Sequence, residues 1–514
     1  MKVLETTYDR PAPTRESAPP RIRFGATVLF LGLTAFTVMA TTTLGQLKYG
    51  VVNVLAVVFV LLVLMMMVVA FPQVKANVRY LWPRLNCWHL IWYGVYISAL
   101  VWERRTYQQV HDSLLDGWSL LRLGPEFLTG LYFLYLLGTG RVKWLSSLFK
   151  GIPGVLAVYC VFSALTTFWS VFAPWTLFKS LEYMLDVSVM AAILCVVKTS
   201  EDYKTLLDWT WTIFSIELIW CCLQVGIWPS ECWDEGRLAG VFPLTGFNAV
   251  GAYAALIATV AMCRLVPVTQ GVFERSWYGV LFLWATALTV MSQTRNALGG
   301  LVIAVVVVLI MSGRAKGIVL LAMSGGLVLF TALGAVVSQY LQRGQSSEAI
   351  ESLTGRMVWW HYAWLIFLEH PWGGVGAYAG GRFAVLKSLG ASTTSSVHSD
   401  YVEILVGTGI PGIVLFSIAV LWTLYSLWGL WRDQSLTPQE RQVSMECFAV
   451  MLVLFVHSFF NVELAWHAPQ FFLVCLGWAE LMRRRRKQQQ EDLWRASTRF
   501  SARPTTTSIV LSPN

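Results

Sequence analysis

The segment His398-Ser399-Asp400-Tyr401-Val402-Glu403 places an imidazole and two carboxylates just before a long apolar run. A histidine is suited to take a proton from a hydroxyl group near neutral pH. A nearby carboxylate, from Asp400 or Glu403, would orient the ring and raise its basicity. A lone histidine can also serve as a cap or loop residue, so His398 is a candidate general base only if other polar groups gather around it.

Three arginines stand where an anionic substrate could be bound. Arg295 lies in Ser292-Gln293-Thr294-Arg295-Asn296, which joins two apolar segments with almost no loop between them. Arg237 and Arg356 lie in other polar connections. A guanidinium group binds a diphosphate in bidentate fashion. For Arg295 alone, snorkelling to a lipid phosphate is an equal alternative.

A glycine-rich segment, His370-Pro371-Trp372-Gly373-Gly374-Val375-Gly376, follows a stretch with helical character over residues 355–369. His370 would sit in the last turn of that helix, where the dipole favours a cationic imidazole. The glycines indicate a tight path whose backbone amides could approach a ligand, although a structural turn fits as well. We regard His370 as a supporting residue, together with Asn248, Asp400 and Glu403.

The composition is that of a membrane protein with many spans. Of 514 residues 56% are hydrophobic and 13% are charged, and the mean hydropathy is +0.58. These values lie outside the range of soluble domains. The net charge of +9 fits basic cytoplasmic loops and the run Arg483-Arg484-Arg485-Arg486-Lys487, so it does not indicate nucleic acid.

A membrane span needs roughly 20 apolar residues, and this rule predicts an all-α polytopic protein with about fourteen transmembrane helices, within a range of about 11–14. The predicted spans are 24–43, 51–71, 86–102, 126–139, 152–172, 181–198, 205–226, 247–265, 276–291, 297–312, 317–337, 406–430, 443–461 and 467–482. The fourth is short and interrupted by glycine.

Lys and Arg in the short loops predict that both termini are cytoplasmic. Residues 1–23 then form a disordered cytoplasmic tail, 24–337 the first eleven spans, and 406–482 the last three. Residues 483–514 form a basic, disordered cytoplasmic tail. The long connection 338–405 becomes a periplasmic loop before the twelfth span, with a helix over 355–369 lying on the membrane surface.

On this topology, His398 and the three arginines all face the outer side of the membrane. The sequence contains no Walker-type phosphate loop, no Rossmann fingerprint, no nucleophile elbow and no metal-binding cluster. We therefore expect no cofactor and no metal. An enzyme without a nucleotide on the outer face needs a substrate that is already activated and delivered by the membrane.

The order of these motifs resembles the O-antigen ligase and O-antigen polymerase superfamily. The resemblance covers roughly residues 230 to 480. It rests on motifs that occur in this order: Arg237-Leu238-Ala239-Gly240 with Asn248, Ser292-Gln293-Thr294-Arg295, His370 to Gly376, His398-Ser399-Asp400-Tyr401, and Gly409-Ile410-Pro411-Gly412. Relatives often carry asparagine after the histidine, whereas this chain has Ser399, so acceptor recognition stays open.

The resemblance implies a fold of the GT-C kind and a glycosyltransferase in the bacterial inner membrane with its active site facing the periplasm. Members move a glycan from undecaprenyl diphosphate to an acceptor, which is a growing chain in polymerases, lipid A core in ligases and a protein in O-oligosaccharyltransferases. His398 matches the family's loop histidine, Arg237 and Arg295 match its diphosphate-binding arginines, and Arg356 is a looser match. Expected partners are this donor, the acceptor, the bilayer and polysaccharide assembly proteins.

Several functions stay open at this point. Within the family, the sequence separates neither polymerisation of O-antigen or exopolysaccharide from ligation to lipopolysaccharide core, nor one acceptor from another. A secondary transporter or a lipid-linked glycan flippase would also have many spans and buried charges, but the chain shows no internal repeat. A structural scaffold would leave the outer arginines and the long loop unexplained.

Overall fold

The computed structural model describes residues 87–99, 106–113, 117–234, 236–242, 244–266, 272–314, 316–317, 355–391, 394–462, 464–465 and 469–501. The predicted first tail, the first two spans, the eleventh span from residue 318 onward and the end of the second tail lie outside these residues.

The described chain is helical apart from one small hairpin. Its elements are α3 (Cys87–Ala99), α4 (Tyr107–Asp112), α5 (Gly117–Gly138), α6 (Lys143–Leu148), α7 (Gly151–Leu165), the 3₁₀ turn η2 (Thr166–Trp169), α8 (Ala173–Val196), α9 (Ser200–Ile227), β1 (Trp233–Asp234), β2 (Arg237–Leu238), α10 (Phe247–Leu265), α11 (Val272–Met291), α12 (Arg295–Met311), α16 (Arg356–Glu369), the π-helical η3 (Gly380–Leu386), α17 (Asp400–Arg432), α18 (Pro438–Ser458) and α19 (Gln470–Ser501).

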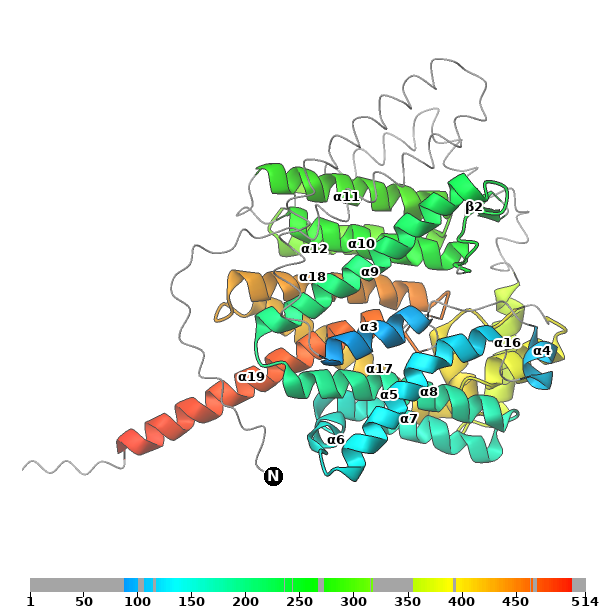
Figure 1. The fold of residues 1–514 in the computed structure, drawn as a ribbon, viewed down its shortest axis with the longest axis horizontal. Helices are drawn as coiled ribbons and strands as arrows, with labels where there is room; N and C mark the ends of the chain where they lie inside the picture. Colours follow the sequence, from blue (N-terminus) through cyan, green and yellow to red (C-terminus); the bar gives the residue numbers. More distant parts are fainter. Residues whose placement is uncertain are drawn as a thin grey trace, which may run out of the picture.

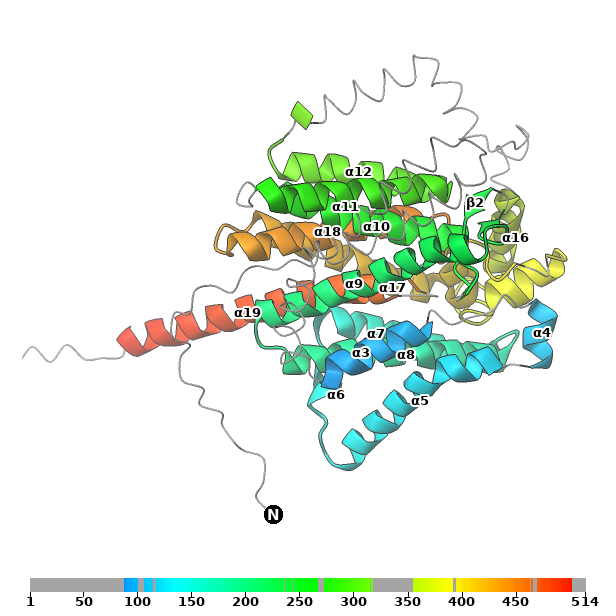
Figure 2. The same ribbon diagram turned by 45° about the horizontal axis from the view of Figure 1, so that its top comes forward.

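Long helices lie side by side and form one bundle (Figure 1). Among the described residues, five helical segments are long and apolar enough to cross a membrane, namely Gly151–Trp169, α9, α10, α17 and α18. Helix α16 and strand β2 lie at one end of the bundle, opposite the projecting end of α19, in both views (Figures 1 and 2). An all-α membrane protein is thereby confirmed, and the number of spans stays a prediction.

Loops that the positive-inside rule assigns to one side gather at one end of the bundle. Gln439, in the first turn of α18, donates to Glu201 at the start of α9 over 3.0 Å. Arg484 of α19 donates to the hydroxyl of Ser147 in α6 over 2.7 Å. The alternation of loops that the sequence predicts is therefore compatible with the fold, whereas the side that faces the cytoplasm stays a prediction.

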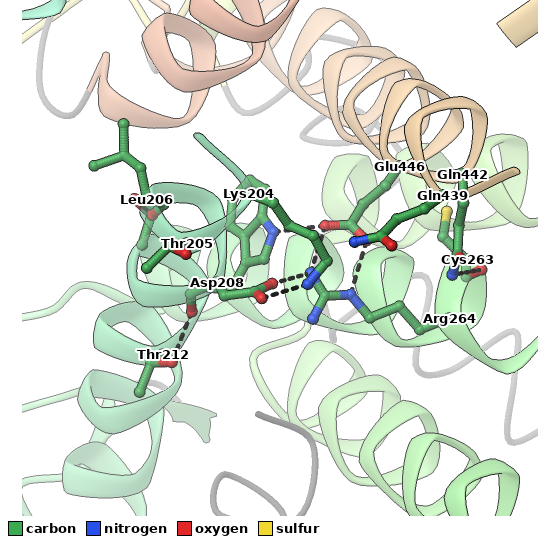
Figure 3. Close-up of polar contacts among 12 residues, drawn as sticks. Lys204, Thr205, Leu206, Asp208, Thr212, Cys263, Arg264, Gln439, Gln442 and Glu446 are labelled. Carbon is green, nitrogen blue, oxygen red and sulfur yellow. Dashed lines mark hydrogen bonds and ion pairs between the residues drawn. The ribbon is translucent and has the colours of Figure 1, made fainter. Parts of the chain in front are cut away.

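A buried charge cluster joins α9, α10 and α18 near this end (Figure 3). The guanidinium of Arg264 donates to Glu446 over 2.8 Å and to Asp208 over 2.6 Å. Lys204 also donates to Asp208, over 2.7 Å, and the indole of Trp211 donates to Glu446 over 2.7 Å. Each buried charge thus has a charged partner, as burial in an apolar bundle requires.

The predicted disordered tail from residue 483 is wrong over residues 483–501, because α19 continues through the basic run to Ser501. Arg483 and Arg484 pair with the fully buried Glu480 one turn earlier. Arg485 pairs with Glu440 at the start of α18 over 2.9 Å. Carboxylates of α19 itself and of α18 therefore compensate the positive charge that would disfavour a helix in isolation.

Other helix bounds differ from the predicted spans in smaller ways. Helix α5 begins at Gly117, nine residues before the predicted start of the fourth span at 126, and contains Pro125, so the helix is longer than the apolar run. Helix α17 begins at Asp400, inside the predicted loop. The helix predicted over residues 355–369 is present as α16, in which Ala363 and Phe367 are buried, whereas its position on the membrane surface stays a prediction.

Helix α17 opens at Gly409, whose φ of 65° and ψ of −160° are not helical. Two residues later Pro411 has no N–H group to donate to the carbonyl of Gly407. The backbone N–H of Gly376 donates to that carbonyl instead, over 3.0 Å. The glycine-rich segment thus supplies the donor that proline removes from the helix.

The neighbouring carbonyl, that of Val406, also accepts a hydrogen bond from the glycine-rich segment. Ile410 N–H turns away from the helix and donates to the carbonyl of Pro371 over 2.8 Å. In a regular helix Ile410 N–H would donate to the carbonyl of Val406. Here that carbonyl accepts from Val375 N–H instead, over 3.0 Å. In a lipid environment an unfilled carbonyl is costly, so the segment 371–376 and the opened turn form one unit.

Glycine is required where these backbones approach each other. A Cβ atom at Gly374, whose φ is +61°, would overlap the backbone of Gly407 and Thr408. On its other side the segment binds the corner between α7 and α8, where Val171 N–H donates to Val375 over 2.9 Å. The segment therefore fixes α7, α8 and α17 relative to one another.

We predict that Glu446→Ala destabilises the protein strongly, because it leaves Arg264 buried with one carboxylate fewer and the indole N–H of Trp211 without its acceptor. Removing one partner of a buried ion pair costs about 3–5 kcal/mol. Thermal unfolding in detergent measures the change. Gln439→Ala is the control, since it removes only an exposed hydrogen bond and should cost less than about 0.5 kcal/mol. Equal melting temperatures for the two variants would contradict the role of the cluster.

A second prediction compares two glycines in the left-handed region. Gly390→Ala, at φ +69° with open space around it, should cost about 1–2 kcal/mol for the backbone conformation alone. Gly374→Ala has the same backbone cost and also overlaps α17, so it should unfold at a clearly lower temperature or fail to accumulate as folded protein. Similar melting temperatures would show that the opened turn does not depend on this close approach.

Candidate functional site

The first arginine of the site lies on a hairpin between α9 and α10. Strand β2 pairs with β1 and brings Arg237 opposite Asp234. The guanidinium carbon of Arg237 lies 3.3 Å from the ring centroid of Phe247, the first residue of α10. This cation–π contact holds the half-buried side chain at the end of the bundle.

Buried polar side chains of α9 hold the loop after this hairpin. The side-chain oxygen of Gln224 accepts from the backbone of Val241 over 2.5 Å and of Phe242 over 2.9 Å. Thr245 donates to Glu217 over 3.2 Å. The path of the loop is therefore set by the interior of the bundle.

The second arginine follows a tight turn between α11 and α12. Gln293 adopts the left-handed φ of 50°, and its amide donates to the carbonyl of Gly236 over 3.3 Å. The hydroxyl of Thr294 donates to the carbonyl of Phe247 over 3.0 Å. Phe247 therefore contacts Arg237 through its ring and the turn before half-buried Arg295 through its carbonyl.

The third arginine begins α16. Arg356 donates to the carbonyl of Phe460 over 2.7 Å, which ties α16 to the loop after α18. Burial and the neighbouring charge of Arg295 lower the pKa of Arg356 to about 10. Arg356 is therefore still cationic at neutral pH, and a ligand with negative charge between the two guanidiniums would relieve their repulsion.

His398 lies in the loop that leads into α17 and is half-buried. Its φ of 55° is left-handed, which is uncommon for a residue with a side chain. The imidazole lies 5.9 Å from the ring of Trp359, centroid to centroid. The indole of Trp360 donates to the carbonyl of Val397 over 2.9 Å. Helix α16 therefore positions both Arg356 and His398.

The two carboxylates after His398 bind backbone amides. Asp400 accepts from Leu464 over 2.8 Å and from Ala465 over 3.3 Å, so it holds the loop between α18 and α19. Glu403 accepts from Val397 over 2.7 Å. Both residues thus support the site through the backbone, which the sequence did not predict.

The other supporting residues lie farther from this group or at its margin. His370 caps the C-terminal end of α16 and is exposed. A helix of this length places it about 20 Å from Arg356 along the axis. Asn248 lies in the first turn of α10, next to Phe247. The structure therefore brings Arg237, Arg295 and Arg356 to one end of the bundle and separates His370 from them.

Some residues of the site were not expected from the sequence. His457, in the last turn of α18, is buried and lies within range of the charge of Arg356. Trp359 contacts His398, and buried Arg382 acts electrostatically on Glu403. The helical spacing of Arg356, Trp359 and Trp360 was a usable signal, whereas nothing near Arg382 in the sequence points to Glu403.

Cationic groups and an imidazole thus share one end of an apolar bundle. Such a group can bind a diphosphate and take a proton from a hydroxyl close to it. The described residues contain no group of three or more His, Cys, Asp and Glu side chains arranged to hold a metal ion.

Part of the chain matches a known protein family. A search of curated proteins found no match to the chain. Residues 280–417 match the family described as O-Antigen ligase. The matched segment includes Arg295, Arg356 and His398, whereas Arg237 and Asn248 precede it. The match over residues 280–417 supports the resemblance to the O-antigen ligase and polymerase superfamily that the order of the motifs predicts.

Proposed function

We propose that this protein is an inverting, metal-independent glycosyltransferase that moves a glycan from undecaprenyl diphosphate to a hydroxyl group of an acceptor sugar. The observation that supports the proposal most directly is the grouping of three arginines and His398 at one end of a membrane bundle. The family match indicates glycan transfer of the O-antigen ligase type. The donor, the mechanism and the roles of the residues are our proposal.

The arginines would bind the diphosphate. Arg237 and Arg295 are linked through Phe247, and Arg295 and Arg356 affect each other electrostatically. The leaving diphosphate gains negative charge as the glycosidic bond breaks. Guanidiniums held at that place before the reaction stabilise the transition state more than the ground state. Because their charge neutralises the diphosphate, the mechanism requires no divalent metal.

His398 would act as the general base. The acceptor hydroxyl loses its proton to the imidazole while its oxygen attacks the anomeric carbon. The bond to the diphosphate breaks on the opposite face of the sugar, so the configuration at that carbon inverts. The proton stays on the imidazole until it is released to solvent.

The acceptor is either a growing surface polysaccharide, in a polymerase, or lipid A core, in a ligase. We place the reaction at the periplasmic face of the bacterial inner membrane, because the loops with most positive charge lie at the other end of the bundle. An undecaprenyl chain can reach the arginines from the bilayer, since Arg295 stands at the start of an apolar helix.

A discontinuous helix such as α17 could also belong to a transporter or flippase, because discontinuous helices often line transport paths. In this protein the carbonyls of Val406 and Gly407 at the opening bind the chain's own amides. They are therefore engaged in structure, which favours a fixed site over a transport path.

We predict that His398→Ala lowers the rate of glycan transfer about 10²–10⁴-fold, as loss of a general base does. Arg295→Ala should lower it about 10²–10³-fold. The assay uses purified protein in liposomes with an undecaprenyl-diphosphate glycan, and measures the released undecaprenyl diphosphate and the length of the product.

Arg441→Ala is the matched control, because Arg441 lies at the opposite end of the bundle and binds the side chain of Gln434 there. It should retain the rate of the unmodified protein. Unchanged transfer by His398→Ala or by Arg295→Ala, with control and variants equally well folded, would exclude the role proposed for that residue. Movement of intact donor between leaflets without release of undecaprenyl diphosphate would favour the flippase.

A further inference from the structure

The backbone before His398 is bound on both sides of one residue. The N–H group of Val397 donates to Glu403 over 2.7 Å, and its carbonyl accepts from the indole of Trp360 over 2.9 Å. Val397 itself is fully buried. The backbone of the residue that precedes His398 is therefore held from α17 through its N–H group and from α16 through its carbonyl.

This restraint acts next to a residue with an unfavourable backbone conformation. His398 has a left-handed φ of 55°, a conformation that residues with a side chain rarely adopt and that must be held by the surrounding structure. If the bonds to Val397 were lost, the loop could relax and the imidazole would point elsewhere. The two groups that bind Val397 thus restrain the conformation of His398, together with the hydroxyl of Ser396, which accepts from the N–H group of His398 over 3.3 Å.

Neighbouring residues in turn fix the position of the Glu403 side chain. A Cβ atom at Gly381 would overlap both carboxylate oxygens of Glu403, so only glycine admits the side chain there. Gly381 and Arg382 belong to η3, and the charge of Arg382 acts on Glu403. The interactions of Glu403 are thus with the backbone of Val397 and Gly381 and with nearby charges.

We propose that Glu403 is a positioning residue that holds His398 in its reactive orientation through the backbone of Val397, and not a carboxylate that raises the basicity of the imidazole by direct contact. This inference rests on the proposed role of His398 as the general base. The proposal also explains why residue 381 is glycine: a larger residue would overlap the carboxylate of Glu403.

The amide variant separates the two kinds of role. In Glu403→Gln the side-chain oxygen can still accept from Val397 N–H, but the negative charge is gone. A backbone restraint therefore predicts that Glu403→Gln retains most of the activity and the pH profile of the unmodified protein. A carboxylate that tunes the imidazole predicts a loss as large as in Glu403→Ala and a displaced acidic limb of the profile.

The experiment measures kcat and KM for the donor in liposomes. Glu403→Ala should lower kcat about 10²-fold, as misplacement of a reacting group by about 1 Å does, and should leave the KM for the donor unchanged because the arginines remain. Gly381→Ala should have the same effect, since it displaces the carboxylate without removing it. Gly429→Ala, in open space on α17, the helix that contains Glu403, should behave like the unmodified protein.

Hydrogen exchange of the segment 394–399 gives a second measurement that does not depend on activity. Exchange at the amide of Val397 should be faster in Glu403→Ala and unchanged in Glu403→Gln. Equal exchange in all three proteins, or equal loss of kcat in Glu403→Ala and Glu403→Gln, would overturn the proposal. Full activity in His398→Ala together with the expected exchange would instead reject the proposed function and leave the backbone restraint intact.

Discussion

The backbone opening of α17 constrains the rest of this end of the molecule. Gly409 leaves the helical path and Pro411 lacks an N–H group, so two carbonyls of the helix need donors from elsewhere. Val375 and Gly376 provide them, at 3.0 Å each. The segment between α16 and η3 is thereby bound to α17. The positions of α16 and η3, which flank this segment, are therefore set relative to α17.

The geometry of the candidate site follows from this constraint. Helix α16 ends at the bound segment, so the position of its first turn, with Arg356, is determined together with the start of α17. The indole of Trp360 reaches the loop before His398 from the same helix. The other two arginines come from a separate unit, in which Phe247 contacts Arg237 and accepts from the turn before Arg295. The site therefore lies where these two units meet.

Much of this architecture could be predicted from the amino-acid sequence. Helix α10 has the predicted bounds 247–265, because a continuous apolar run between polar loops leaves little choice in a bilayer. The candidate arginines and His398 could be named because charges beside apolar spans are costly and therefore informative. The helical character of residues 355–369 was visible as well.

The remaining features depend on partners that are distant in the sequence. The bond between Glu403 and the amide of Val397, six residues earlier, could not be predicted although it is local, because it accompanies a left-handed conformation of His398 that the sequence does not reveal. The helix through Arg483 to Arg486 was missed because Glu440 and Asp433, which pair with Arg485 and Arg486, belong to other segments. The contact of Arg237 with Phe247 requires the hairpin, which is too short to show a strand pattern.

The central claim is that the arginines and His398 serve one substrate at one end of the bundle. An experimental structure of the protein in lipid with undecaprenyl diphosphate bound tests it most directly. We expect the two phosphates to lie between Arg237, Arg295 and Arg356, with the side chain of His398 facing the same space. Phosphates bound at the opposite end, beside the basic run of α19, or a His398 turned away from the three arginines would contradict the account.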